Sequence, residues 1–227
     1  MVGSGIASSL IHEVGHQGAA LLDLVESIRP VLQGMQQTGS AQQIVWHLWE
    51  RWLSEILADL WAVARVGVAA TVGLMGVVSL PRAFVFRVSL DDPHPIPWVR
   101  VRLSCVMGNA LFPHPQWQRL SALWESFYPR AGLDPERRAL LTLLEESMPG
   151  FVGLMVNHRP QTLRGNSLKE VFAVDERRPA RLTDQYQAWR TVPDRLYSAR
   201  PSLVFAAIGQ AKMDGKLIPR SSSDFWL

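Results

Sequence analysis

The segment His12-Glu13-Val14-Gly15-His16 combines two imidazoles and a carboxylate at a spacing that suits metal chemistry. On a helix, residues four apart are separated by about 40° around the axis, so both imidazoles face the same point. Neutral imidazole is a good zinc ligand, and the neighbouring glutamate can take a proton from water that the metal has acidified. The motif therefore predicts a zinc site in which His12 and His16 are ligands and Glu13 is the general base.

A later helix offers a third ligand, as expected of catalytic zinc sites, which use three protein ligands and leave one position for water. Glu55 can reach the metal, and Asp59, one turn later, can accept a hydrogen bond from the free ring nitrogen of a ligand histidine. Both are flanked by Trp52, Ile56 and Trp61. Burying two carboxylates there is costly unless a cation or hydrogen bonds compensate. The alternative is that both face solvent on an amphipathic helix.

These motifs, H-E-x-x-H followed by E-x-x-x-D on a later helix, resemble those of the gluzincin zinc peptidases. The segment His94-Pro95-Ile96-Pro97-Trp98-Val99-Arg100 is similar to the H-P-(x)4-R segment of the HtpX-like and CAAX-prenyl-protease branch. The resemblance implies hydrolysis of a peptide or protein substrate with Zn2+ as the cofactor. It also implies that His94 stabilises the oxyanion and that Arg100 holds the cleft or a substrate carbonyl.

The resemblance covers residues 8 to about 105 and departs from the family in two respects. Eleven residues precede His12, too few for the sheet that usually lies across a gluzincin cleft, and the paired membrane helices of HtpX-like enzymes are missing. We therefore expect a shortened domain or a substrate-binding edge contributed by later residues. His114, in a rigid proline-flanked turn, is the second candidate for the oxyanion role.

A function of another class is a non-catalytic, zinc-stabilised helical interaction module. In this alternative, zinc or a hydrogen-bonded cluster of the same residues holds the first two helices together, while a tryptophan-rich surface binds a partner. A closed fourth coordination position, for example one occupied by His94, would favour it. For the four tryptophans of the second helix we favour a thick buried core face over a cofactor or lipid site.

Apolar periodicity predicts a mainly α fold: a compact helical domain with the zinc site between two core helices and at most a small β element at 83–90. The first helix is expected to end at Pro30, and Pro149 is expected to interrupt the pattern near its position. We expect a division near residue 130, into a zinc-binding gluzincin-like core (1–130) and a helical C-terminal region of unknown role (131–227). The expected helices span residues 6–32, 42–66, 99–111, 116–127, 134–147, 182–190 and 201–213.

Composition narrows the classes of partner and compartment. The 227 residues are 48% hydrophobic and carry a net charge of only +3, with no dense basic stripe, so we expect no nucleic-acid partner. Cys105 is the single cysteine, which excludes an internal disulfide and a cysteine-based zinc site; we interpret it as an inert buried thiol.

The stretch Leu60 to Leu80 is long enough to cross a membrane but contains Arg65 and three glycines. A buried helix–turn segment explains it as well. We expect a cytoplasmic protein without a signal peptide, and we keep a membrane-associated peptidase anchored by residues 60–80 as the alternative.

Overall fold

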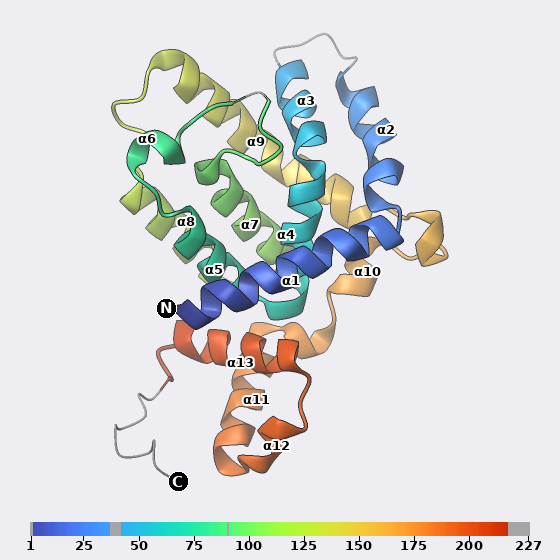
Figure 1. The fold of residues 1–227 in the computed structure, drawn as a ribbon, viewed down its shortest axis with the longest axis vertical. Coiled ribbons are helices and arrows are strands. Elements are labelled where there is room, and N and C mark those ends of the chain that lie inside the picture. The colour runs from blue at the N-terminus through green and yellow to red at the C-terminus, as the bar shows by residue number, and fades with distance from the viewer. Residues whose placement is uncertain (1, 37–41, 90, 218–227) are drawn as a thin grey trace.

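The computed structural model describes residues 2–36, 42–89 and 91–217, with only the backbone described for the first few of them. Within these ranges every regular element is a helix and no strand forms, which confirms the mainly α, compact helical prediction (Figure 1). Residues 83–89 contain the end of a short helix, and Leu90 lies outside the described residues. The elements are α1 (Val2–Leu21), α2 (Leu24–Gln36), α3 (Gln43–Arg51), α4 (Leu53–Val66), α5 (Val68–Val78), α6 (Arg82–Val85), α7 (Pro97–Leu111), α8 (Gln116–Phe127), α9 (Pro135–Asn157), the 3-10 turn η1 (Gln161–Leu163), α10 (Leu168–Phe172), the 3-10 turn η2 (Asp175–Arg177), α11 (Pro179–Thr191), α12 (Asp194–Tyr197) and α13 (Pro201–Met213).

Two proline-based predictions of helix ends are wrong. The first helix ends at Leu21, and the chain turns at Asp23, which adopts a left-handed φ of 52° that aspartate tolerates better than most residues. Pro30 lies inside α2, and Pro149 lies inside α9, which continues to Asn157. Each proline removes one helical hydrogen bond, and burial of the apolar face of its helix compensates for that loss.

Helix α4 is the centre of the fold and packs against α1, α5, α7 and α13. Trp49 and Trp52 are almost fully buried and Trp46 nearly so, which confirms a core face for the second predicted helix and removes them from any partner-binding surface. Trp61 is half-buried and packs edge-on against Phe172. The second predicted helix is divided into α3 and α4 at Trp52, whose backbone angles (φ −88°, ψ 1°) depart slightly from helical values.

Two clusters of buried side chains hold the helices together. The larger includes side chains of α1 to α10, and the smaller joins α11 to α13, the lower helices in Figure 1. Gly209 of α13 approaches Ala69 of α5 so closely that a Cβ at Gly209 would lie 2.5 Å from the Ala69 Cβ, which ties the lower helices to the main body. The division expected near residue 130 falls between α8 and α9, which share the larger cluster, and it stays a prediction.

The segment from Leu60 to Leu80 does not form one spanning helix, because Gly67 (φ 58°, ψ −135°) separates α4 from α5. Among the described residues one helix, α9, is long and apolar enough to cross a membrane. Within its apolar stretch of 18 residues, 39% is buried inside the protein. A core helix of a soluble protein meets the same criteria, so α9 is weak grounds for a membrane location.

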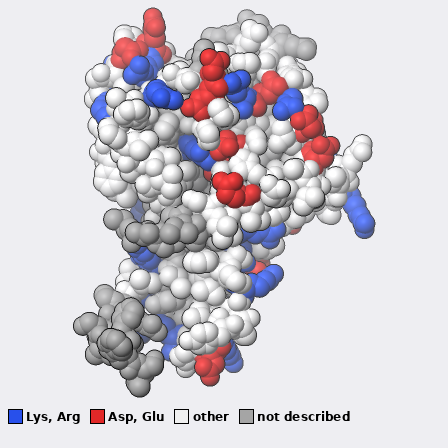
Figure 2. Space-filling view, in the orientation of Figure 1, with Lys and Arg blue, Asp and Glu red and all other residues white. Residues whose placement is uncertain are grey.

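Charged side chains of both signs are interspersed on the face shown in Figure 2, mainly in its upper part, with uncharged areas between them. Ion pairs among the described residues include Arg29 with Glu26 and Arg102 with Glu125. The absence of a nucleic-acid partner stays a prediction.

Replacing Gly67 by alanine should lower the free energy of unfolding by about 1–3 kcal/mol, because its backbone conformation strains any residue with a side chain. Gly76 of α5 is the matched control: it is exposed, with open space around a Cβ, and alanine there should leave stability unchanged or raise it by up to about 1 kcal/mol. Urea unfolding followed by circular dichroism measures both variants. Equal stabilities would contradict this role of Gly67.

Candidate metal centre

The close approach of α1 to α4 brings the predicted ligands together. A Cβ on Gly15 would lie 2.9 Å from the Cα and carbonyl oxygen of Ala58, and one on Gly18 would lie 2.6 Å from the Trp61 ring. Real Cβ atoms do not come this close to other heavy atoms, so the two glycines allow a distance between the backbones that larger residues would prevent. Gly15, at the variable position before the second histidine of the motif, is therefore needed for the packing of α1 against α4.

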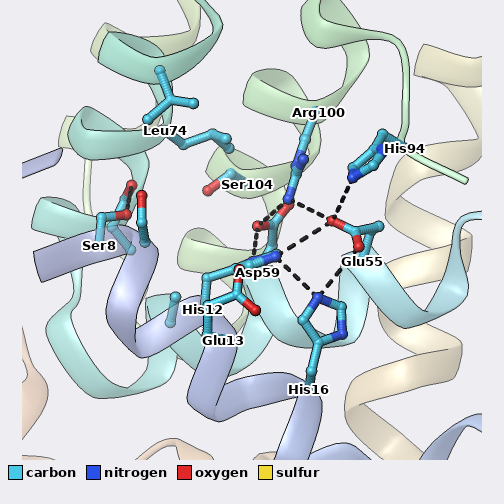
Figure 3. Close-up of a pocket in the computed structure, with 14 residues that line it drawn as sticks. Ser8, His12, Glu13, His16, Glu55, Asp59, Leu74, His94, Arg100 and Ser104 are labelled. Atoms are coloured by element: carbon cyan, nitrogen blue, oxygen red, sulfur yellow. Dashed lines mark hydrogen bonds and ion pairs between the residues drawn. The ribbon is translucent and has the colours of Figure 1, made fainter. Parts of the chain in front are cut away.

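Three donor atoms converge between these helices (Figure 3). The Nε2 atoms of His12 and His16 are 3.2 Å apart, and they lie 3.3 Å and 3.2 Å from the two carboxylate oxygens of Glu55. A tetrahedral zinc ion with ligands at about 2.0–2.1 Å separates its donor atoms by about 3.3 Å. The separation of the two nitrogens is close to this value, and each nitrogen lies near a different Glu55 oxygen. The three residues are usual zinc ligands, and one donor atom from each lies within 4.8 Å of the others, which makes them a candidate metal site.

Arg100 of α7 faces the two acidic residues of α4. Its Nε and Nη2 atoms donate to Asp59 at 2.6 Å and 3.0 Å, and Nη2 also donates to Glu55 at 3.1 Å. This two-pronged contact is the strong geometry of an arginine–carboxylate pair. The structure brings Arg100 into the site as the partner of Asp59 and Glu55, which shows how two carboxylates are accommodated in a largely buried place.

The protonation of the site follows from these contacts. Burial acts to lower the pKa of His12, but contacts with the Asp59 and Glu55 carboxylates outweigh it and raise that pKa from 6.5 to about 9. Burial acts to raise the pKa of Asp59, and the charge of Arg100 together with the His12 contact holds it below its usual value. A proton on His12 therefore balances the second carboxylate when no metal is bound, and a metal ion would replace that proton because both use the Nε2 lone pair.

The outer ring nitrogens of the two histidines also have partners. Nδ1 of His12 lies 2.8 Å from Oδ1 of Asp59, as expected for an orienting residue, although the ring is not aligned for a straight hydrogen bond. Nδ1 of His16 lies 3.2 Å from the Ser54 hydroxyl. Ser54 was not predicted from the sequence, where its one signal is its place directly before Glu55.

His94 reaches the site from the loop before α7. Its Nε2 atom lies 3.7 Å from Oε2 of Glu55, outside the three-donor group, and its side chain is 56% exposed. Asp92, which was also not predicted from the sequence, holds the ring: its Oδ1 atom is 2.9 Å from Nδ1 of His94 and accepts from the His94 backbone N–H at 3.0 Å. His94 is therefore positioned beside the three donors with its Nε2 atom toward the cavity (Figure 3).

A cavity of about 320 Å³ opens over the donors. Its polar lining includes Glu13, Glu55 and His94, and its apolar lining includes Leu74 and Val77 of α5. Leu74 lies across the cavity from His94 (Figure 3). Glu13 is exposed, and no hydrogen bond or ion pair of its carboxylate is found among the described residues. The arrangement therefore leaves a carboxylate available for proton transfer next to the donors.

Other residues considered from the sequence lie elsewhere. His114 accepts a hydrogen bond from the Gln116 backbone within its turn and does not line the cavity. Cys105 is buried, and burial raises its pKa to about 12, which agrees with an inert thiol.

Replacing Gly15 by alanine should destabilise the metal-free chain by about 1–3 kcal/mol, because the new methyl group meets Ala58 backbone atoms that cannot rotate away. Gly34 of α2, with no atom within 4 Å of a Cβ, is the matched control and should tolerate alanine. Urea unfolding in the presence of a chelator measures both. A Gly15→Ala variant as stable as Gly34→Ala would contradict the close helix contact.

Replacing Arg100 by methionine should destabilise the metal-free chain by about 3–5 kcal/mol, because it leaves the Asp59 and Glu55 carboxylates without their cation. The control is Arg87→Met, which removes an exposed ion pair with Asp92 and should cost at most about 1 kcal/mol. Thermal and urea unfolding of the two variants compare these losses. Similarly small losses of stability in both variants would show that Arg100 does not neutralise the Asp59 and Glu55 carboxylates.

Comparisons with known proteins give no match for this chain: no family model, no curated protein and no solved structure is similar to it. The resemblance to gluzincin peptidases therefore rests on the sequence motifs alone.

Proposed function

We propose that the chain is a zinc-dependent hydrolase that cleaves peptide bonds in a peptide or protein substrate. The supporting observation is the convergence of His12, His16 and Glu55 at the edge of an open cavity, with donor spacings of 3.2 Å and 3.3 Å. Three protein ligands with an open side are typical of catalytic zinc sites, whereas structural zinc sites are closed by four.

Zinc suits this donor set because two imidazole nitrogens and a carboxylate oxygen are among its usual ligands. A zinc ion held there would supply Lewis acidity, which polarises a carbonyl oxygen and lowers the pKa of water. Asp59 and Ser54 orient the two histidines, and Arg100 keeps Glu55 and Asp59 in place.

Glu13 is the proposed general base. It follows the ligand His12 on α1 and lines the same cavity, so its carboxylate can take a proton from water as the water oxygen bonds to the substrate carbonyl carbon. The same carboxyl group then returns the proton to the amine nitrogen as the carbon–nitrogen bond breaks. His94, whose Nδ1–H donates to Asp92, is placed to donate from Nε2, in the protonated form of the ring, to the oxygen on which negative charge develops.

One observation favours a second candidate, the non-catalytic module. Without a metal the charged groups pair with one another: Arg100 bridges Asp59 and Glu55, and His12 contacts both. Such a cluster can hold α1, α4 and α7 together without catalysis. The surface that binds a partner would then lie away from the buried tryptophans.

The decisive experiment compares zinc content and peptide hydrolysis in the wild type and four variants. Glu13→Gln should keep about one zinc per chain and lose hydrolysis by about 10²- to 10⁴-fold, because it removes the base and leaves the ligands. His16→Ala and Glu55→Ala should lose or weaken zinc binding. Glu146→Gln, at an exposed position of α9, is the control and should change neither property.

The outcomes separate the two candidates. Unchanged hydrolysis in Glu13→Gln contradicts its role as base, and full zinc content in both ligand variants contradicts the ligand set. Zinc that stabilises the wild type while no peptide in a broad mixture is cleaved would favour the non-catalytic module.

A further inference from the structure

A second hollow lies next to the metal cavity. It has a volume of about 250 Å³ and is formed by the segment from Leu80 to Ser89, which contains α6, and by the loop from Asp92 to Pro97. His94 lines both the metal cavity and this hollow, so the two spaces adjoin at the residue that is placed beside the donors.

Both spaces have exposed apolar side chains in their lining. Val77 lines the metal cavity, and Leu80 and Phe84 line the second hollow. Their exposed fractions are 56%, 42% and 53%, so all three large apolar side chains remain in contact with water. Ile96, which is buried, adds a further apolar surface to the hollow.

The charges of the second hollow are paired with one another. Nη2 of Arg87 lies 3.3 Å from Oδ2 of Asp92, whose Oδ1 accepts from His94. A charged side chain entering the hollow would lose water without meeting an uncommitted partner, which is unfavourable. An apolar side chain would lose water against Leu80, Phe84 and Ile96, which is favourable.

We propose that this second hollow is a specificity subsite that binds an apolar side chain, such as leucine or phenylalanine, of the substrate residue next to the cleaved bond. The inference rests on the proposed function for the position of the cleaved bond. It adds the substrate class: peptides with a large apolar residue beside that bond, rather than an acidic or small one.

Binding tests the subsite without requiring hydrolysis. The full-length, zinc-loaded Glu13→Gln variant is titrated by calorimetry with blocked pentapeptides Ala-Ala-X-Ala-Ala, where X is phenylalanine, leucine, alanine or aspartate. Peptides with phenylalanine or leucine should bind about 10-fold or more tightly than those with alanine or aspartate, the discrimination expected of a hydrophobic pocket.

Further substitutions in the Glu13→Gln variant test whether the second hollow causes the preference for large apolar residues. Phe84→Ala and Leu80→Ala should each reduce the preference for large apolar residues to about 3-fold or less, since each removes part of the apolar lining. Phe127→Ala on α8, which removes an equally exposed phenylalanine outside both cavities, should leave it unchanged. Affinity that does not depend on X, or a preference that survives both lining variants, overturns the subsite.

Hydrolysis of the same peptides by the wild type separates this inference from the proposed function. Selective binding that depends on Phe84, without cleavage of any peptide, supports the second hollow as a binding site for an apolar side chain and contradicts the peptidase. Cleavage of the alanine and phenylalanine peptides at equal kcat/KM supports the peptidase and overturns the subsite.

Discussion

The close packing of α1 on α4 determines whether the candidate site exists at all. Gly15 and Gly18 lie where a side chain would meet the Ala58 backbone and the Trp61 ring, so the two helices approach almost backbone to backbone. At that distance the imidazoles on α1 reach Glu55 directly, with nitrogen–oxygen distances of 3.2–3.3 Å. The four-residue spacing places both imidazoles on the same side of α1, and the two glycines let α1 come close enough to α4 for the imidazoles to contact Glu55.

The second requirement is charge balance. Two carboxylates of α4 lie in a largely buried place, where a single unpaired charge would be strongly destabilising. Arg100 supplies one positive charge from α7, and a proton on His12 supplies the other in the metal-free protein. A zinc ion would replace that proton and add one further positive charge, so the two carboxylates have positive partners with and without metal. This is why the contacts among them are compatible with a catalytic site and with a structural cluster.

What favours the catalytic interpretation lies on the open side of the donors. Glu13 faces the cavity without a partner among the described residues, and His94 stands beside it on a loop held by Asp92. Helices carry the groups that need a fixed geometry, and a loop carries the group that adjoins both the metal cavity and the second hollow. This distribution is common in binding sites, where a rigid scaffold positions residues on loops.

Local spacing in the sequence determined the helical fold class, the shared face of His12 and His16, and the buried tryptophan face, because each depends on residues within a few turns of one helix. The ligand requirements of zinc and the helical spacing of Glu55 and Asp59 made these two residues candidates, and motif resemblance added His94 and Arg100. The tertiary structure alone decided that Arg100 pairs with the acidic residues and that Ser54 and Asp92 support the histidines. It also decided that Pro30 and Pro149 stay within helices. These features depend on contacts and burial between elements that are distant in the chain. The free energy of such packing cannot be predicted from the periodicity of a single segment.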